Sequence, residues 1–224
     1  MAQCYHVGGY SPVDPWEGVR GTMPSSARRA RERASTRERI IEAALGVLES
    51  EGAAALTMRR VASDMEYTAP IVYQHFANKD ALVLELVAHG YRLMVAEVRR
   101  VLEEPDIDRR MLRVASEYVR FAGRHPHLYE AMNGTVVGAN QRRSAAEPAF
   151  DILLELLTTW SGAHDVDLAD RTEACEIVWG TLYGMASLGY LGTVGNERAQ
   201  RLAEQALSAI LRGWQGEGPR FSRS

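Results

Sequence analysis

Apolar residues recur along most of the chain at the three-to-four-residue spacing that is typical of amphipathic helices. The first clear stripe consists of Ile41, Ala44, Leu45 and Leu48. Gly52 follows this stripe as a stop signal, and two short helices are predicted next, over residues 58–65 and 69–76. Thr57 and Thr68 stand directly before these helices, where a threonine hydroxyl can cap the first turn. The pattern therefore predicts three consecutive helices, with a tight turn between the last two.

The rest of the chain continues the helical pattern. Asn78 is a suitable N-cap for a long helix over residues 79–103, and Pro105 separates that helix from the next. Further helices are predicted over residues 112–125, 127–132, 150–160, 169–192 and 197–214. The segment 134–144 is predicted to be a polar loop. Since no strand-like alternation of useful length occurs, the chain is predicted to be all-α.

The first three helices, of about 11, 8 and 8 residues, have the dimensions of a helix-turn-helix unit. In such a unit one helix crosses the phosphate backbone and supports a second helix in the major groove. The apolar face of the first helix is expected to meet Val61, Ala62 and Val72, with Phe76 at the bottom. The pattern therefore favours a DNA-binding domain over residues 35–82.

Composition raises one objection to a nucleic-acid partner. The chain has 26 Lys and Arg against 29 Asp and Glu, which gives a formal net charge of −3. This average conceals an uneven distribution, because six arginines lie between Arg28 and Arg39, against two glutamates. Lys79 is the only lysine, and it opens the predicted fourth helix. The arginine-rich segment is therefore a candidate basic arm beside the helix-turn-helix unit.

Many positions of the N-terminal segment match a known pattern at fixed spacing. They are Ala43, Ala44, Gly52, Thr57, Val61, Ala62, Tyr73, Phe76, Lys79 and Leu82. Through them, this segment resembles the DNA-binding domain of the tetracycline-repressor (TetR/AcrR) family of bacterial transcriptional regulators. The resemblance implies that Tyr73 and Lys79 contact DNA phosphates. The whole set of predicted DNA-binding residues is Arg37, Thr57, Thr68, Ala69, Pro70, Ile71, Val72, Tyr73, Gln74 and Lys79.

The turn before the predicted recognition helix departs from the family pattern. The family usually has a small residue followed by glycine there, whereas this chain has Met65 and Glu66. Either Glu66 accepts a positive φ, at a cost on the order of 1 kcal/mol, or the turn takes a different shape. Ile71 and Val72 replace the more usual small residues, so apolar contact with thymine methyl groups is expected.

The resemblance implies that residues 83–216 form a helical-bundle domain for ligand binding and dimerisation. Segments 124–132 and 178–188 resemble a subgroup whose C-terminal domain carries a Trp-His-Gly signature, with Tyr183 at the histidine position. Gly180 and Gly184 are spaced so that two helix backbones can approach closely. A homodimer through the last two helices is therefore expected.

Aromatic and methionine side chains on the C-terminal helices are suited either to a plain core or to a ligand pocket. Such residues are more often core than pocket, but tyrosine and tryptophan need polar partners when buried. The predicted ligand-binding residues are Tyr118, Phe121, Tyr129, Met132, Trp160, Trp179 and Tyr183. The expected ligand is a small-molecule effector, and no cofactor is expected.

Residues 177–196 contain no charged side chain and approach the length of a membrane span. The segment has five glycines, and acidic Glu176 and Glu197 flank it, so a helix buried in protein is favoured. Cys4 and Cys175 are too few for a disulfide scaffold and too far apart for a zinc motif, which favours a reduced, cytoplasmic setting. No membrane partner is expected.

Signals for catalysis or metal binding are weak. His125 and His127 lack a carboxylate or cysteine at ligand spacing, and Asp165 and Asp167 lack the glycine and distal glutamate of a calcium loop. We therefore expect neither an enzyme nor a metal site. If the chain were an enzyme, substitution of these histidines or aspartates would be expected to abolish turnover.

These observations predict a homodimeric, ligand-responsive regulator of transcription, acting as a repressor on a near-palindromic operator. Residues 1–34 are predicted to be a disordered extension with the basic arm, and residues 217–224 a flexible tail. The alternative is a helical ligand-binding or membrane-associated protein with a vestigial helix-turn-helix. Salt-dependent binding to a specific DNA fragment separates the two.

Overall fold

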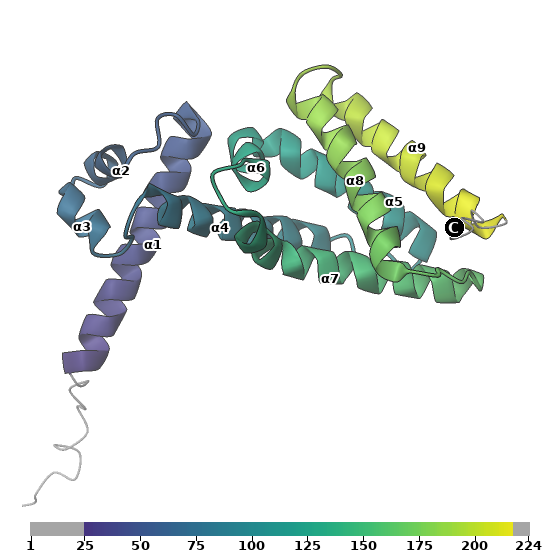
Figure 1. Cartoon of the computed structure of the whole chain (residues 1–224), viewed down its shortest axis with the longest axis horizontal. Helices are drawn as coiled ribbons and strands as arrows, with labels where there is room; N and C mark the ends of the chain where they lie inside the picture. The colour runs from purple at the N-terminus through teal and green to yellow at the C-terminus, as the bar shows by residue number, and fades with distance from the viewer. Residues whose placement is uncertain (1–24, 217–224) are drawn as a thin grey trace, which may run out of the picture. The chain divides into compact units, whose positions relative to one another are not determined.

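The computed structural model describes residues 25–216, and these form nine α-helices and no strand (Figure 1). The helices are α1 (Ser25–Glu51), α2 (Met58–Asp64), α3 (Ala69–Tyr73), α4 (Lys79–Arg99), α5 (Ile107–Arg124), α6 (Pro126–Asn133), α7 (Ala139–His164), α8 (Arg171–Tyr190) and α9 (Asn196–Gln215). The all-α prediction is confirmed. The parts of the predicted extension and tail over residues 1–24 and 217–224 lie outside the described residues.

Helix α1 begins at Ser25, so the predicted extension is helical over residues 25–34. Arginine and alanine make up most of this stretch, and both have high helix propensity. Arg28 and Glu32 form an ion pair of 3.2 Å one helical turn apart, which adds local support. Residues up to Glu38 form one unit and residues from Arg39 onward form another, in which all the following elements lie.

The C-terminal half of α1 packs with α2 and α3 around a small apolar core. The predicted contacts are present, because both the α1 face and the facing side chains are buried in one cluster: Ile41, Ala44, Leu48, Val61, Ala62, Val72 and Phe76. Gly52, with a φ of 81°, ends α1 where the sequence predicts a stop. The helix-turn-helix packing therefore follows the apolar pattern.

The turn between α2 and α3 is a Schellman motif with glutamate in the position that usually holds glycine. Glu66 has a φ of 58°. Its N–H donates to the Ser63 carbonyl at 3.1 Å, and the N–H of Tyr67 donates to the Ala62 carbonyl at 2.9 Å. Of the two alternatives left by the sequence, the structure shows the first: Glu66 accepts the left-handed conformation.

The remaining helices form a bundle. Helices α8 and α9 lie side by side, α5 packs against both of them, and α4 packs against α6 and α7 (Figure 1). Helix α7 starts at Ala139, so the predicted polar loop is shorter than expected; α4 ends at Arg99 and turns continue to Pro105. The apolar pattern does not reveal where α4 ends or where α7 begins, because the residues around both positions are largely polar.

The uncharged stretch noted in the sequence lies mostly in α8. None of the helices within residues 25–216 combines the length and the apolarity needed to cross a membrane.

Replacing Glu66 with glycine is expected to raise the free energy of unfolding by about 1 kcal/mol, because glycine reaches the left-handed region without the steric cost of a Cβ. Denaturant titration of the full chain, followed by far-UV circular dichroism, measures the change. Glu66→Ala is the matched control, since it removes the same carboxylate but keeps the Cβ. Equal stabilisation by both variants would show that the effect comes from loss of the Glu66 carboxylate, and it would contradict backbone strain at this position.

Candidate nucleic-acid interface and helical cavity

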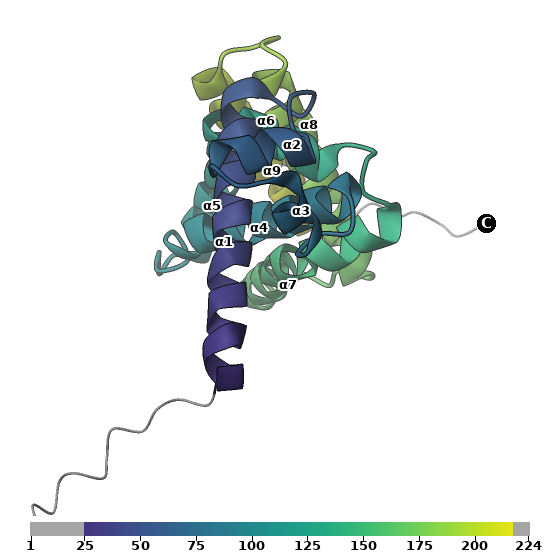
Figure 2. The ribbon, with the colours of Figure 1, turned by 90° about the vertical axis from the view of Figure 1, so that its left-hand side faces the viewer.

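The short helix α3 lies beside α2 (Figure 2). Its exposed side chains are of mixed polar and apolar character. Tyr73 is 54% exposed, and Thr68, Pro70 and Gln74 are also exposed. Ala69 and Ile71 are half-buried. Together these residues form a surface that a DNA groove could contact.

Val72 is the one α3 residue of the predicted DNA-binding set whose side chain is completely buried. It belongs to the core between α1, α2 and α3, which was its other predicted role. A contact between this side chain and a thymine methyl group therefore does not fit the structure, and Ile71 is the remaining candidate for such a contact.

The three predicted caps differ in what their side chains do. The Thr57 hydroxyl accepts from the Arg60 N–H at 3.1 Å, and the Asn78 side-chain oxygen accepts from the Ala81 N–H at 2.9 Å. Thr68 occupies the N-cap position of α3 but makes no capping hydrogen bond. Its hydroxyl is thus not committed to the helix that it precedes.

Lys79 has a structural partner. Its ammonium donates to the carbonyl of Ala53 at 3.1 Å and so ties the start of α4 to the connection between α1 and α2. An ammonium has three donors, and this hydrogen bond uses one of them. The side chain is half-buried, which leaves room for a second contact to a phosphate.

Arg39 and Tyr67 form a contact next to the turn between α2 and α3. The sequence did not predict this contact. Arg39 Nη1 donates to the Tyr67 hydroxyl at 2.6 Å, and the guanidinium carbon lies 5.0 Å from the ring centroid. The two residues are 28 positions apart, so no local spacing links them. Arg37, the predicted DNA-binding arginine, lies in the N-terminal unit, which ends at Glu38.

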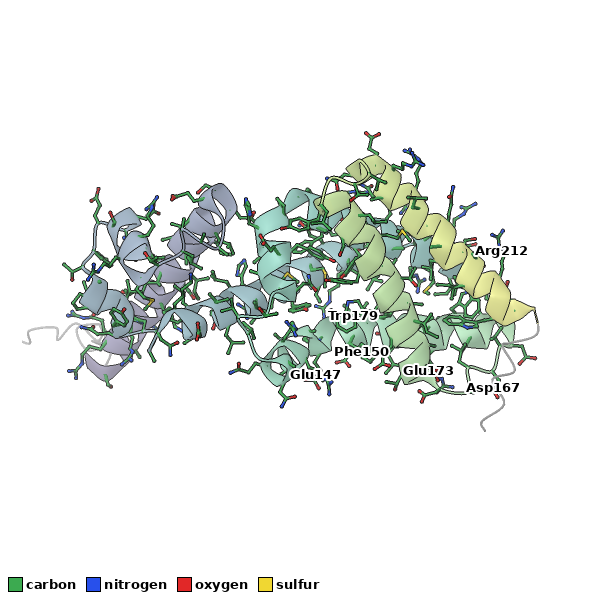
Figure 3. The ribbon with its side chains drawn as sticks, turned by 45° about the horizontal axis from the view of Figure 1, so that its top comes forward. Glu147, Phe150, Asp167, Glu173, Trp179 and Arg212 are labelled. Atoms are coloured by element: carbon green, nitrogen blue, oxygen red, sulfur yellow. The ribbon has the colours of Figure 1, made fainter. Side chains whose placement is uncertain are left out.

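Four helices of the bundle line a cavity of about 70 Å³ that is partly open to solvent. Its lining residues come from α4, α5, α7 and α8: Tyr91, Met94, Val95, Val98, Val114, Tyr118, Ala146, Ala149, Phe150, Ile152, Leu153, Trp179 and Leu182. Phe150 and Trp179 lie close together where α7 and α8 face each other (Figure 3). Of the predicted ligand-binding residues, Tyr118 and Trp179 line this cavity.

Tyr129 and Met132 of α6 and Phe121 of α5 are buried but do not line the cavity. Tyr129 is linked to it indirectly, because its hydroxyl lies 3.4 Å from that of Tyr118. Tyr183 is largely exposed on α8. A role of these residues in ligand binding stays a prediction.

Trp160 lies in a separate polar cluster. Its indole N–H donates to the Asp108 carboxylate at 2.9 Å, and His164 Nε2 lies 3.0 Å from the same oxygen. The Trp160 ring also packs against Trp214. These contacts give the indole N–H of the completely buried Trp160 a hydrogen-bond partner. The burial of this tryptophan is therefore explained without a bound ligand.

Tyr91 and Phe150 are cavity residues that sequence reasoning missed. Tyr91 is buried on α4, in the region that the sequence assigned to the ligand-binding domain without naming any residue of this helix as a ligand contact. An aromatic residue on the apolar stripe of α4 was the signal that could have identified it.

A cluster of charged side chains joins α1, α4 and α5. Glu97 of α4 and Glu117 of α5 are each only 6% exposed. Arg124 Nη2 pairs with Glu97 Oε2 at 2.8 Å and also with Glu117. His125 Nδ1 lies 3.4 Å from Glu49 Oε1, near the end of α1. Each buried carboxylate therefore has a cationic partner, as burial of charge requires.

The weak metal signals find no geometric support in the part of the chain that the structure describes, where no three His, Cys, Asp or Glu residues could hold a metal ion together. Asp165 instead ends α7 with a φ of 52°.

Comparison with known proteins gives family matches at both ends of the described chain. Residues 40–86 match the model of bacterial regulatory proteins of the tetR family. Residues 111–210 match the model of a tetracyclin repressor-like C-terminal domain.

Individual relatives agree with these matches. The chain is 28% identical to an uncharacterized HTH-type transcriptional regulator, YobS of Bacillus subtilis, over 96 residues, which are 43% of this chain and 50% of YobS. It is 30% identical to the nucleoid occlusion factor SlmA of Vibrio vulnificus over 105 residues, which are 46% of this chain and 54% of SlmA. The chain thus spans about half the length of these curated relatives.

Solved structures share the fold. The structure of the fatty acid degradation regulator FadR from Bacillus halodurans superimposes with a TM-score of 0.65 at 16% identity, covering 77% of this chain and 94% of FadR. Since both matched models describe parts of one family and the fold agrees, the chain belongs to the tetR family of bacterial regulatory proteins.

Proposed function

We propose that this chain is a cytoplasmic repressor of transcription that binds a near-palindromic operator as a homodimer and is released by a small molecule. The observation that carries this proposal is the surface of α3, where Thr68, Pro70 and Tyr73 are exposed on a helix supported by α2. In a dimer, two such helices would enter successive major grooves, with centres about 34–36 Å apart.

Tyr73 and Lys79 are suited to fix the register of α3 on the DNA backbone. The Tyr73 hydroxyl is a neutral donor on an exposed side chain, and the Lys79 ammonium retains donors beyond its bond to Ala53. Phosphate contacts of this kind position a protein without reading sequence. Thr68, Ile71 and Gln74 are then the residues that would contact base edges.

The exposed face of α8 is the proposed dimer interface, together with α9. Ile177 and Tyr183 are large apolar or aromatic residues exposed on this face. A Cβ added to Gly180 or Gly184 would meet no atom within 4 Å, so both glycines border open space in the single chain. A second copy could therefore approach the α8 backbone closely. Tyr183 would take the histidine position of the Trp-His-Gly subgroup, to which we assign the C-terminal domain.

Helix α4 provides a route from a bound ligand to the DNA. It begins at Lys79 beside the helix-turn-helix unit, and its later turns supply Tyr91, Met94, Val95 and Val98 to the cavity wall. A ligand that binds better when α4 is displaced would favour the conformation in which the spacing of the two α3 helices no longer fits the operator. Only this difference in affinity between the two states can drive release.

The DNA contacts are tested by measuring affinity for an operator selected from a random DNA pool, over a range of salt concentrations. Lys79→Ala is expected to weaken binding to all sequences and to lower the salt slope by about one for each Lys79 in the complex. Tyr73→Phe is expected to weaken binding with little change in slope, because it removes a hydroxyl and not a cation.

Arg212→Ala is the matched control for charge, because it also removes one cation, but from an exposed position near the end of α9 (Figure 3). It is expected to leave the salt slope unchanged. If no DNA fragment is bound specifically at any salt concentration, the proposal that the chain is a transcriptional regulator is wrong. The alternative, a helical protein with a vestigial helix-turn-helix, then takes its place.

The dimer interface is tested by Gly180→Leu, measured by analytical ultracentrifugation. The new side chain has space in the single chain but would collide with a closely approaching partner helix, so conversion to monomer is expected with the helical content retained. Gly162→Leu on α7 is the control, because its Cβ also meets nothing within 4 Å and the residue lies outside the proposed interface. Dimers of unchanged affinity in Gly180→Leu would contradict the α8 interface.

A further inference from the structure

The wall of the cavity carries no charge. Its lining residues are apolar or aromatic, and none of them is Asp, Glu, Lys, Arg or His. An ion that entered this space would lose its hydration without gaining a counter-charge, which is strongly unfavourable. The chemistry of the wall therefore selects against carboxylates and amines in their charged forms.

Tyr91 supplies a polar group at this wall that lacks a partner. The side chain is only 4% exposed, and among residues 25–216 its hydroxyl forms no hydrogen bond. Burial raises the pKa of Tyr91 to about 12, so the hydroxyl is protonated at neutral pH and can both donate and accept. Arg142, the cation that acts most on Tyr91, donates to the Gly134 carbonyl and does not line the cavity.

The other cavity tyrosine differs from Tyr91. Burial also raises the pKa of Tyr118, but its hydroxyl lies within hydrogen-bond distance of the Tyr129 hydroxyl. In the part of the chain that the structure describes, no such neighbour is present at the Tyr91 hydroxyl, which leaves it free to pair with a ligand that enters the cavity. Tyr91 is therefore the group through which a ligand would be oriented.

The α7 wall can yield to a ligand larger than the present cavity. The volume of about 70 Å³ exceeds the roughly 10–15 Å³ that one water needs, but it is small for an organic effector. Pro148 lies inside α7, between the lining residues Ala146 and Ala149. Because proline lacks an N–H, the α-helical ladder is interrupted at this point, and α7 is weakest where it covers the cavity.

We infer that the cavity binds an uncharged, largely apolar molecule that carries one hydroxyl or carbonyl group, hydrogen-bonded to Tyr91. This inference rests on the proposed function, in which a ligand of the C-terminal helices controls DNA binding. It names the chemical class of that ligand.

Calorimetric titration of the full chain without DNA tests the ligand class, using octan-1-ol, octanoate and octylammonium as probes of equal chain length. Octan-1-ol is expected to bind at least about tenfold more tightly than either ion, because only the ions must be desolvated against an uncharged wall. Tyr91→Phe is expected to weaken octan-1-ol binding by about three- to tenfold, since the variant keeps the ring and loses one hydrogen bond.

Two further variants serve as controls. Tyr190→Phe removes a tyrosine hydroxyl outside the cavity lining and is expected to leave octan-1-ol affinity unchanged. Ala149→Phe places a ring into the cavity from the half-buried face of α7 and is expected to abolish binding. Circular dichroism and thermal unfolding establish that each variant is folded.

The inference is overturned if an ion binds as tightly as octan-1-ol, if Tyr91→Phe has no effect, or if octan-1-ol does not bind up to its solubility. None of these outcomes depends on DNA. Failure of the proposed regulator would instead appear as the absence of specific operator binding, with the octan-1-ol titration unaffected.

Discussion

The burial of two carboxylates at the junction of α1, α4 and α5 is the constraint on which the rest of the arrangement depends. Glu97 and Glu117 are almost completely buried, and both pair with Arg124. Arg124 itself is 43% exposed, but removing it would leave two buried carboxylates without their cation, which is more costly than loss of a pair whose members are both exposed. Helices α4 and α5 are thereby fixed against each other at one defined register.

This register matters because α4 takes part in both functional regions. Its first residue, Lys79, is hydrogen-bonded to the connection between α1 and α2, and its middle turns form one wall of the cavity. Glu97 lies near its other end, where His125 and Glu49 are also close. Polar contacts thus hold α4 at both ends, while apolar side chains and a proline-interrupted α7 surround its middle. In the proposed regulator, the ligand acts on the middle of α4, where apolar contacts and not polar ones fix the helix.

The apolar pattern predicted the helix-turn-helix packing well, because the contacts among Ile41, Val61 and Val72 follow from helical spacing within one short segment. A positive φ at Glu66 was one of two alternatives that the sequence left open, and the structure shows this one. The sequence did not yield the partner of Lys79 or the contact between Arg39 and Tyr67. Each joins residues more than 25 positions apart, at places where no periodicity links them. For the same reason the sequence could not distinguish the roles of Trp160 and Tyr118, which are both aromatic residues on C-terminal helices. In the structure, Trp160 is hydrogen-bonded to Asp108, whereas Tyr118 lines the cavity.

The central claim is that two copies of the chain place their α3 helices in successive major grooves of one operator. Hydroxyl-radical footprinting of the full chain on a selected operator tests this most directly. A dimer bound in this way gives two related protected regions, one helical turn apart at about 34–36 Å, and both are lost in the Gly180→Leu variant at concentrations at which the unaltered chain binds. A single protected region, or protection that Gly180→Leu leaves intact, would contradict this claim.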